Sequence, residues 1–317
     1  MFKVLPTLLF ILLNIPGTTI GQGMTPPPAY YRNVAIADSL MDINNYQDAT
    51  IHYTMAFKAF QWFGTPDDRY KAARAWGLTG NLDSLNKVLT YLCNKSRYWN
   101  YQKFANDAAF SILKGTARFD EIIACMKENK KKEAPSVNIE FYNMLDTIYT
   151  TDQQCRNAAS IAESRKDFDT AVVNRLWDEV ERVDSINTQK ITAFLDKYGW
   201  LGPDEVGNIG NKALFLVIQH ATPDVQEKYF PMMKKAVSEK KALPMDLALL
   251  EDRISVDKYG YQIYGSQLTQ DPTTNTIRLF PIQDEVNVNK RRKSVGLEPL
   301  EDYVKRFHLT YTPVTGK

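Results

Sequence analysis

The feature that most constrains the fold is a helical pattern that recurs at nearly constant spacing through the first half of the chain. Asn45-Tyr46, Asn81-Leu82 and Arg118-Phe119 each follow a short break and open a new helical pattern, at spacings of 36 and 37 residues. Apolar and small residues recur at helical intervals within each unit, so neighbouring helices can stack closely. The pattern therefore predicts pairs of antiparallel helices from about residue 30 to about residue 128.

These units resemble tetratricopeptide-type repeats in a degenerate form. The resemblance implies a helical repeat domain at residues 24–130, and we expect its surface to bind an unknown protein or peptide partner. A charged segment, Lys127 to Ser136, follows the repeats and contains Pro135 near its end. Charge and proline predict a linker here, leading to a second domain at residues 131–317.

The second domain has a helical pattern until its last quarter. Residues 261–268 and 276–281 are rich in β-favouring side chains, and turn-forming residues at 271–275 separate them. This arrangement predicts a small β-hairpin, with two short helices after it. The expected fold is therefore mainly α: tetratricopeptide-like helical repeats, then a helical domain that carries a C-terminal β-hairpin.

The first 23 residues have the order of parts that is typical of a secretory signal. Lys3 precedes an apolar stretch at residues 5–15, and small or turn-forming residues follow at 16–23. We expect a signal peptide at 1–23, cleaved near residues 21–23, and a mature protein in the periplasm or outside the cell. A retained membrane anchor is the alternative, and we expect no transmembrane segment in the mature chain.

Charge and cysteine content narrow the possible partners and cofactors. The formal net charge is +2, so we expect no nucleic-acid partner, and we expect the basic run at 290–293 to form a solvated helix face. For Cys93, Cys125 and Cys155 we favour free, buried thiols over a single bridge. No cysteine or histidine spacing indicates a metal, and the motifs of serine hydrolases, nucleotide-binding proteins and zinc proteases are missing, so we expect no metal or cofactor.

Short stretches of the second domain resemble an uncharacterised bacterial family, "domain of unknown function 6624", over about residues 140–305. They occur in the expected order: Asp152 to Arg156, Gly199-Trp200, Gln219-His220-Ala221, Leu249 to Arg253, Gln262 to Gln267, and a basic segment ending Val295-Gly296-Leu297. Ser266 stands where the family pattern leads us to expect threonine, which keeps the hydroxyl group. The resemblance implies domain limits and no established activity.

His220 is the main candidate for chemistry, because it ends a very apolar helical segment. It could act as a general acid or base near neutral pH, or it could be a core histidine with a hydrogen-bonded ring. Asp152 and Arg156 are four residues apart and share a helix face. They could form an ordinary ion pair, or Arg156 could clamp an anionic group. Gln219 and Asp152 are expected to support the site.

A second set of candidates lies where the last long helix meets the hairpin. Arg253 could anchor a carboxylate or phosphate, with Asp252 beside it, or it could cap buried carbonyl groups. Tyr264 and Gln267 are expected on opposite faces of the first hairpin strand, where they could bind polar substrate groups. Packing of Tyr264 beside a polar edge is the alternative.

Two functions remain open at this point. The first is an exported protein- or peptide-binding module of the bacterial cell envelope, favoured by the degenerate repeats and the missing catalytic motifs. The second is a metal-independent hydrolase or lyase that acts on a small anionic substrate. In that hypothesis His220 is the acid/base, Arg156 and Arg253 orient the substrate, and Tyr264 and Gln267 bind its polar groups.

Overall fold

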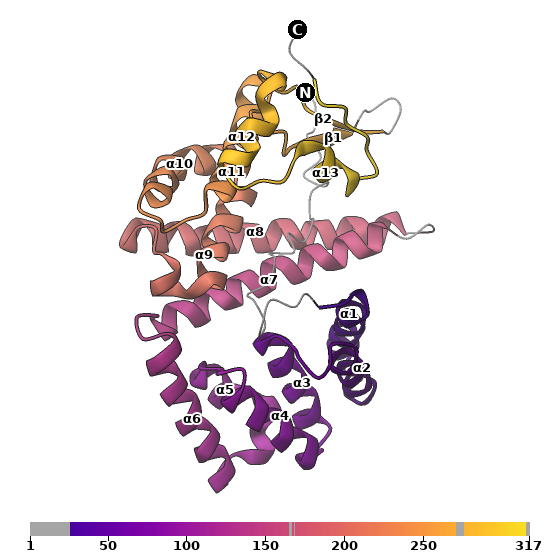
Figure 1. The fold of residues 1–317 in the computed structure, drawn as a ribbon, viewed down its shortest axis with the longest axis vertical. Coiled ribbons are helices and arrows are strands. Elements are labelled where there is room, and N and C mark those ends of the chain that lie inside the picture. Colours follow the sequence, from indigo (N-terminus) through magenta and orange to yellow (C-terminus); the bar gives the residue numbers. More distant parts are fainter. Residues whose placement is uncertain (1–25, 165–166, 168, 271–275, 315–317) are drawn as a thin grey trace. The chain divides into compact units, whose positions relative to one another are not determined.

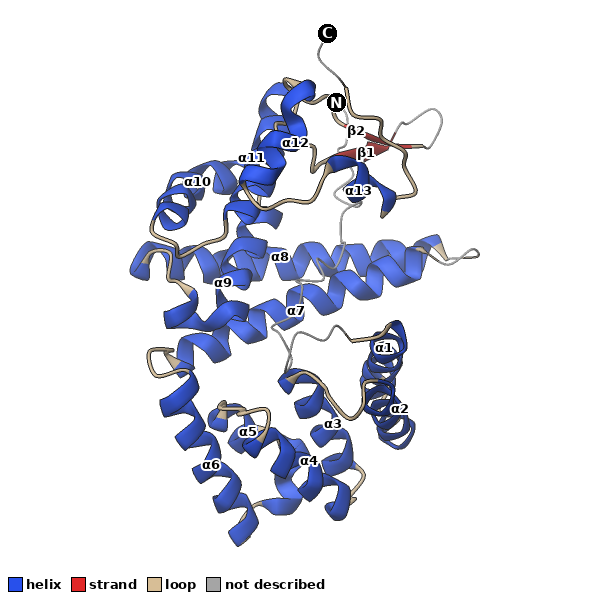
Figure 2. Cartoon of the chain, viewed as in Figure 1, coloured by secondary structure: helices blue, strands red, loops and turns tan. Residues whose placement is uncertain are grey.

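The computed structural model describes residues 26–164, 167, 169–270 and 276–314, so the predicted signal peptide lies outside the described residues. Helices make up most of the fold, and the described strands form one small antiparallel pair (Figures 1 and 2). This confirms the predicted mainly α fold with a β-hairpin. In the described part of the chain, none of the helices combines the length and the apolar character that a membrane span needs.

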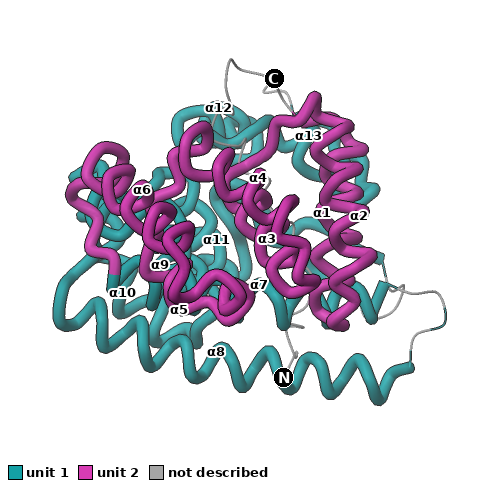
Figure 3. The backbone as a smooth tube through the Cα atoms, turned by 90° about the horizontal axis from the view of Figure 1, so that it is seen from below, with its two compact units in different colours: residues 1–12, 140–317 teal, residues 13–139 magenta. Residues whose placement is uncertain are grey.

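The chain divides into two compact units that meet at Ile139 and Glu140, coloured separately in Figure 3. The helices of the N-terminal unit are α1 (Pro28–Asp42), α2 (Tyr46–Ala59), α3 (Pro66–Leu78), α4 (Leu82–Asn94), α5 (Tyr101–Asn106), η1 (Ala108–Leu113) and α6 (Ala117–Glu133). Neighbouring helices pack in pairs, α1 with α2 and α3 with α4.

The starts of α2, α4 and α6 follow from local capping chemistry. The side chains of Asn45, Asn81 and Thr116 accept hydrogen bonds from backbone N–H groups in the first turn of each helix. These contacts satisfy donors that a helix N-terminus otherwise leaves unpaired. The helices therefore begin within one residue of the recurring breaks in the sequence.

Two sequence predictions for this unit are wrong. Helix α6 continues to Glu133, so most of the expected linker at Lys127 to Ser136 is helical, and its lysines at 130–132 lie favourably in the last helical turn. Cys93 and Cys125 form a disulfide between α4 and α6, whereas Cys155 is free. Sequence spacing did not indicate the bridge, because packing of α6 on α4 is what brings the two residues together.

The C-terminal unit is built on five long helices. They are α7 (Ile139–Glu163), α8 (Thr170–Tyr198), α9 (Pro203–His220), α10 (Pro223–Ser238) and α11 (Pro244–Tyr259). Proline begins α9, α10 and α11, where its missing N–H costs no hydrogen bond. Helix α9 is the central one, since nine of its eighteen residues are buried against its neighbours.

The hairpin is shorter than the sequence predicts. Strands β1 (Leu268–Gln270) and β2 (Ile277–Leu279) pair antiparallel, with Leu268 opposite Leu279, and η2 (Glu285–Asn287), α12 (Val288–Ser294) and α13 (Leu300–Lys305) follow. Tyr264 to Gln267 precede β1 in a loop, which overturns their expected place on a strand. Gly265 in this loop has φ +75°, and a Cβ atom there would lie 3.0 Å from the Leu300 side chain.

The basic run at 290–293 is not a uniformly solvated face, contrary to expectation. Arg292 is only 1% exposed, and it donates hydrogen bonds to the backbone carbonyl groups of Glu298 and Tyr264. Its guanidinium also lies 4.9 Å from the centre of the Tyr303 ring. Lys290 and Lys293 are exposed. Arg292 therefore holds together the small C-terminal elements.

Candidate functional site

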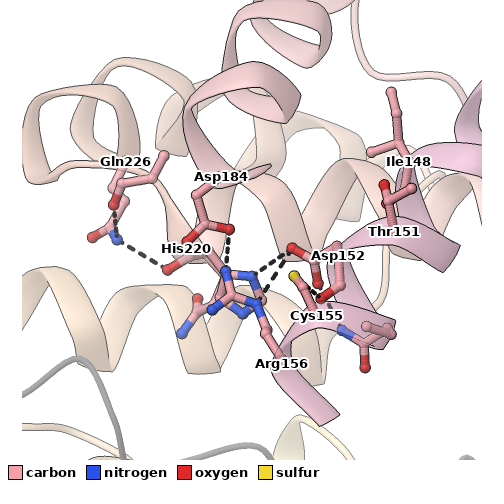
Figure 4. Close-up of polar contacts among 11 residues, drawn as sticks. Ile148, Thr151, Asp152, Cys155, Arg156, Asp184, His220 and Gln226 are labelled. Atoms are coloured by element: carbon pink, nitrogen blue, oxygen red, sulfur yellow. Dashed lines mark hydrogen bonds and ion pairs between the residues drawn. The ribbon is translucent and has the colours of Figure 1, made fainter. Parts of the chain in front are cut away.

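The candidate site is a polar cluster in the core of the C-terminal unit. Figure 4 shows its side chains from α7, α8 and α9, together with Gln226 of α10. Arg253 of α11 also acts on the charges of this cluster. The central contact joins His220, the last residue of α9, to Asp152 of α7. The Nδ1 atom of His220 lies 3.1 Å from Oδ1 of Asp152. Both side chains are almost fully buried, with exposures of 6% and 1%. If Nδ1 carries the proton, it donates to Asp152 and the basic lone pair of the ring is on Nε2.

Arg156 links the carboxylates of two helices. Its Nε atom donates to Oδ1 of Asp152, 3.4 Å away on the same face of α7, and its Nη2 atom donates to Asp184 of α8. The sequence predicted the Asp152–Arg156 pair from its i, i+4 spacing. Asp184 was not predicted. The signal that could have identified it is its position four residues after the buried Val180, which places a carboxylate on an otherwise apolar stripe of the helix.

The buried surroundings determine the charge state of His220. Burial is the main cause that lowers the pKa of His220 to about 4. The positive charge of Arg156 acts in the same direction, whereas Asp152 opposes the shift. The imidazole is therefore neutral at pH 7, contrary to what a helix C-terminus alone would favour. Burial also raises the pKa of Asp152, but His220 and Arg156 outweigh it and hold that pKa below its usual value.

Asp184 is the most accessible carboxylate of the cluster, with 21% of its side chain exposed. Burial raises its pKa to about 6, and the negative charge of Asp152 acts in the same direction, whereas Arg156 and Arg253 oppose it. Asp184 therefore exchanges a proton close to neutral pH. It places a titratable group at the side of the cluster that solvent reaches.

Arg253 of α11 adds a second positive charge to the cluster. Burial and the charge of Arg156 lower its pKa, whereas Asp184 and Asp257 raise it. Unlike Arg156, Arg253 makes no ion pair and no hydrogen bond to any described residue. The Arg253 side chain is partly exposed to solvent, so its guanidinium is available to an incoming anion.

Neighbouring amides hold the end of α9 in place. Gln226 of α10, which is 3% exposed, donates from Nε2 to the carbonyl groups of Gln219 and Ala221, at 3.0 and 2.9 Å. Gln219 itself donates to the carbonyl of Leu249 on α11. These contacts fix the backbone on both sides of His220. Gln226 carries no catalytic signature in the sequence, and only its place after the helix end could have indicated this role.

The structure separates the other predicted residues from this cluster. The carboxylate of Asp252 is fully buried and accepts hydrogen bonds from the backbone N–H groups of Ile263, Tyr264 and Ser266, at 2.6, 2.8 and 2.9 Å. The Tyr264 hydroxyl lies 3.4 Å from Glu251. The backbone N–H of Gln267 donates to the side chain of Gln262. Asp252, Tyr264 and Gln267 therefore form a network that folds the loop before β1.

Cys155 lies beside the cluster, but its surroundings disfavour a nucleophilic role. Its thiol hydrogen-bonds to the backbone carbonyl of Asp152, one turn earlier on α7. Burial is the main cause that raises the pKa of Cys155 to about 11. The thiol is therefore protonated at neutral pH, and a protonated thiol is a poor nucleophile.

Ligand atoms of Asp152, Asp184 and His220 lie within 4.8 Å of one another, close enough to surround a metal ion. The guanidinium of Arg156 already donates to both carboxylates, and Arg253 adds a further positive charge. A divalent cation would have to displace one arginine and approach another. The two positive charges disfavour a divalent cation at this position.

A family model described as a family of unknown function (DUF6624) matches residues 140–313. The matched range includes the cluster on α7, α8, α9 and α11 and also the loop network around Asp252. No curated protein and no solved structure matches the chain.

Proposed function

This chain belongs to the DUF6624 family, whose function is unknown, and we propose that its family domain binds a small anionic substrate and uses the neutral imidazole of His220 as a general base. The contact between His220 Nδ1 and Asp152 Oδ1 carries the proposal. A carboxylate at Nδ1 orients the ring and favours the tautomer whose basic lone pair is on Nε2, which is the form that a general base requires. Hydrolysis or elimination is the corresponding class of reaction.

One of the two guanidinium groups around His220 can receive an anionic substrate. Two carboxylates, Asp152 and Asp184, balance two guanidinium groups, Arg156 and Arg253, and the histidine is neutral at pH 7. Arg156 is engaged by both carboxylates, whereas Arg253 makes no ion pair with a described residue. Arg253 therefore supplies the binding charge, and Arg156 keeps Asp152 in position.

Sulfate binding tests the anionic part of the proposal, because sulfate keeps its charge across the neutral pH range. A ligand present at 100 times its Kd stabilises a protein by about 2.7 kcal/mol, so saturating sulfate should raise the melting temperature clearly. The increase should be lost in Arg253→Gln and largely kept in Arg253→Lys. Arg182→Gln is the matched control, since Arg182 is an exposed arginine on α8 that pairs with Glu179. Equal sulfate responses of the wild type and Arg253→Gln would contradict the proposal.

A substrate panel tests the catalytic part. Small carboxylate and phosphate compounds with a cleavable ester or amide, or with a leaving group β to an acidic C–H, should include one that the mature protein converts. His220→Gln should then lower kcat by about 100-fold or more, with binding of the anion retained. Unchanged kcat in a folded His220→Gln protein would contradict a general-base role.

We also propose that the protein acts outside the cytoplasm, after cleavage of the signal peptide predicted at residues 1–23. The Cys93–Cys125 disulfide supports this, because structural disulfides persist mainly in oxidising compartments such as the periplasm or the extracellular space. Fractionation of cells that express the full chain tests it. We expect the exported fraction to contain a protein that lacks its first 21–23 residues.

The N-terminal unit supports a second function, which is binding of a protein or peptide partner. Ile51, Met55 and Trp62 are about half exposed, at 51%, 48% and 55%. Ile51 and Met55 are one turn apart on α2, and Trp62 follows that helix. Neighbouring exposed apolar side chains, such as Ile51 and Met55, often mark an interaction surface.

A double variant, Ile51→Asp with Met55→Asp, tests this second function. Wild-type protein should retain a specific envelope polypeptide in a capture experiment, and the variant should lose it while keeping its melting temperature. Lys58→Glu on the same helix is a control for a change of surface charge. Equal capture by wild type and the double variant would contradict binding through this surface.

A further inference from the structure

Asn187 is a buried residue whose amide N–H group finds no acceptor among the described residues. It lies on α8, is 3% exposed, and its Nδ2 group has no hydrogen-bond partner within the described part of the chain. Asn187 is three residues after Asp184, so both side chains lie on the same face of the helix, about 4.5 Å apart along its axis. Leaving a buried N–H group unpaired costs free energy, and a bound ligand can offset that cost.

Gln219 provides a second buried amide with an unpaired atom, next to His220 in the chain. It is 8% exposed and directly precedes His220 on α9. Its Nε2 atom donates to the backbone carbonyl of Leu249, which is 3.4 Å away. Leu249 is on α11, one helical turn before Arg253. The Oε1 atom of Gln219 is buried and accepts no hydrogen bond from any described residue. The side chain thus lies between the helix of His220 and the helix of Arg253.

We propose that Asn187 and Gln219 extend the anion site, so that its ligand is a small carboxylate whose chain also carries a hydroxyl or amide group. In this arrangement Arg253 binds the carboxylate, Asn187 donates to an oxygen of the second group, and Gln219 accepts its O–H or N–H. The inference rests on the proposed function, because it takes Arg253 as the anchor of the anionic group. It adds a rule of specificity: an apolar acid of equal size leaves both amides unpaired and binds less tightly.

Two matched pairs of probes test the rule with the full mature protein. Glycolate is compared with propionate, and N-acetylglycine with 4-methylpentanoate, by isothermal titration calorimetry at one pH and ionic strength. The members of each pair have similar size and equal charge, and only one member carries the polar group. The polar member should bind about tenfold more tightly in at least one pair, which is the gain of roughly one net hydrogen bond.

The variant Asn187→Leu removes the amide and keeps the size of the side chain. It should reduce the tenfold preference to less than about threefold while the apolar member binds as before, because the Arg253 contact remains. Its melting temperature without ligand should stay equal or rise, since the unpaired N–H is gone. Asn174→Leu is the control, because Asn174 is an exposed asparagine on the same helix.

The outcomes separate this inference from the proposed function. Equal binding of polar and apolar acids, each dependent on Arg253, overturns the inference and leaves the anion site standing. A clear drop in the melting temperature of Asn187→Leu also overturns it, because the amide would then be paired with an internal water or a protein group. Binding of none of the four acids, together with no response to sulfate, overturns both.

Discussion

His220 and Asp152 are 68 residues apart in the sequence, and their side chains meet with 3.1 Å between Nδ1 and Oδ1. Arg156 donates to the same carboxylate oxygen from one helical turn away. Asp152 therefore serves two partners at once: it orients the imidazole and neutralises the guanidinium. Because all three side chains are buried, removing any one of them leaves another without its partner.

The low pKa of His220 predicts a pH-dependent contribution to stability. Its folded-state pKa of about 4 is below the unfolded value of 6.5, so the unfolded chain binds more protons between these values. The contribution is fully present above pH 6.5 and is lost as the pH falls towards 4. The free energy of unfolding of the wild type, relative to His220→Gln, should therefore fall by roughly 2–3 kcal/mol between pH 7 and pH 4.5. A difference that is constant over this range would contradict a neutral, buried His220.

Arg156 should be important for folding as well as for the site. Arg156→Met leaves the buried Asp152 and the partly buried Asp184 without their shared partner, and we expect a loss of about 3 kcal/mol in urea unfolding. Arg182→Met, which removes an exposed pair on α8, should have no measurable effect. Similar unfolding midpoints for the two variants would show that Arg156 is not part of a buried network.

The disulfide should be a clear stabilising element of the N-terminal unit. Cys93 and Cys125 close a loop with a sequence separation of 32, and a loop of that length is expected to contribute about 3–4 kcal/mol. Reduction, or the double variant Cys93→Ala with Cys125→Ala, should lower the melting temperature. Alkylation of the denatured, unreduced protein should modify one thiol per chain, that of Cys155. Modification of three thiols would contradict the bridge.

Asp252 should control the loop before β1. Asp252→Asn replaces a carboxylate that accepts from three backbone N–H groups by an amide with a single acceptor oxygen, at a cost of about 2–3 kcal/mol. Amide hydrogen exchange at Ile263, Tyr264 and Ser266 should accelerate. The control is Asp257→Asn, at an exposed site on the same helix. Unchanged exchange in Asp252→Asn would show that the loop is held by other contacts.

The sequence predicted local features well where short-range chemistry determines them. Proline at position 223 and asparagine at positions 45 and 81 mark helix starts, and the spacing of Asp152 and Arg156 predicts their pairing. Each of these depends on residues within one or two helical turns. Such contacts are the same in almost any tertiary fold that keeps the helix.

Contacts between distant helices could not be predicted from one sequence. Asp184 was missed because its importance comes from packing of α8 against α7, which brings it to Arg156. Tyr264 was assigned to a strand because its neighbours favour β structure, but Asp252 takes the backbone N–H groups that a strand would use. Arg292 was predicted to be exposed to solvent, but it is buried. Two backbone carbonyl groups and the Tyr303 ring compensate for the burial of its charge.

The most direct test of the proposed site is the pKa of His220 measured by NMR with and without sulfate. The chain has three histidines, and the signal of His220 is the one missing from His220→Gln. Without sulfate we predict a midpoint near 4; saturating sulfate should raise it, because an anion at Arg253 favours the protonated imidazole beside it. A midpoint near 6.5 without sulfate, or one that saturating sulfate leaves unchanged, would contradict an anion site at His220.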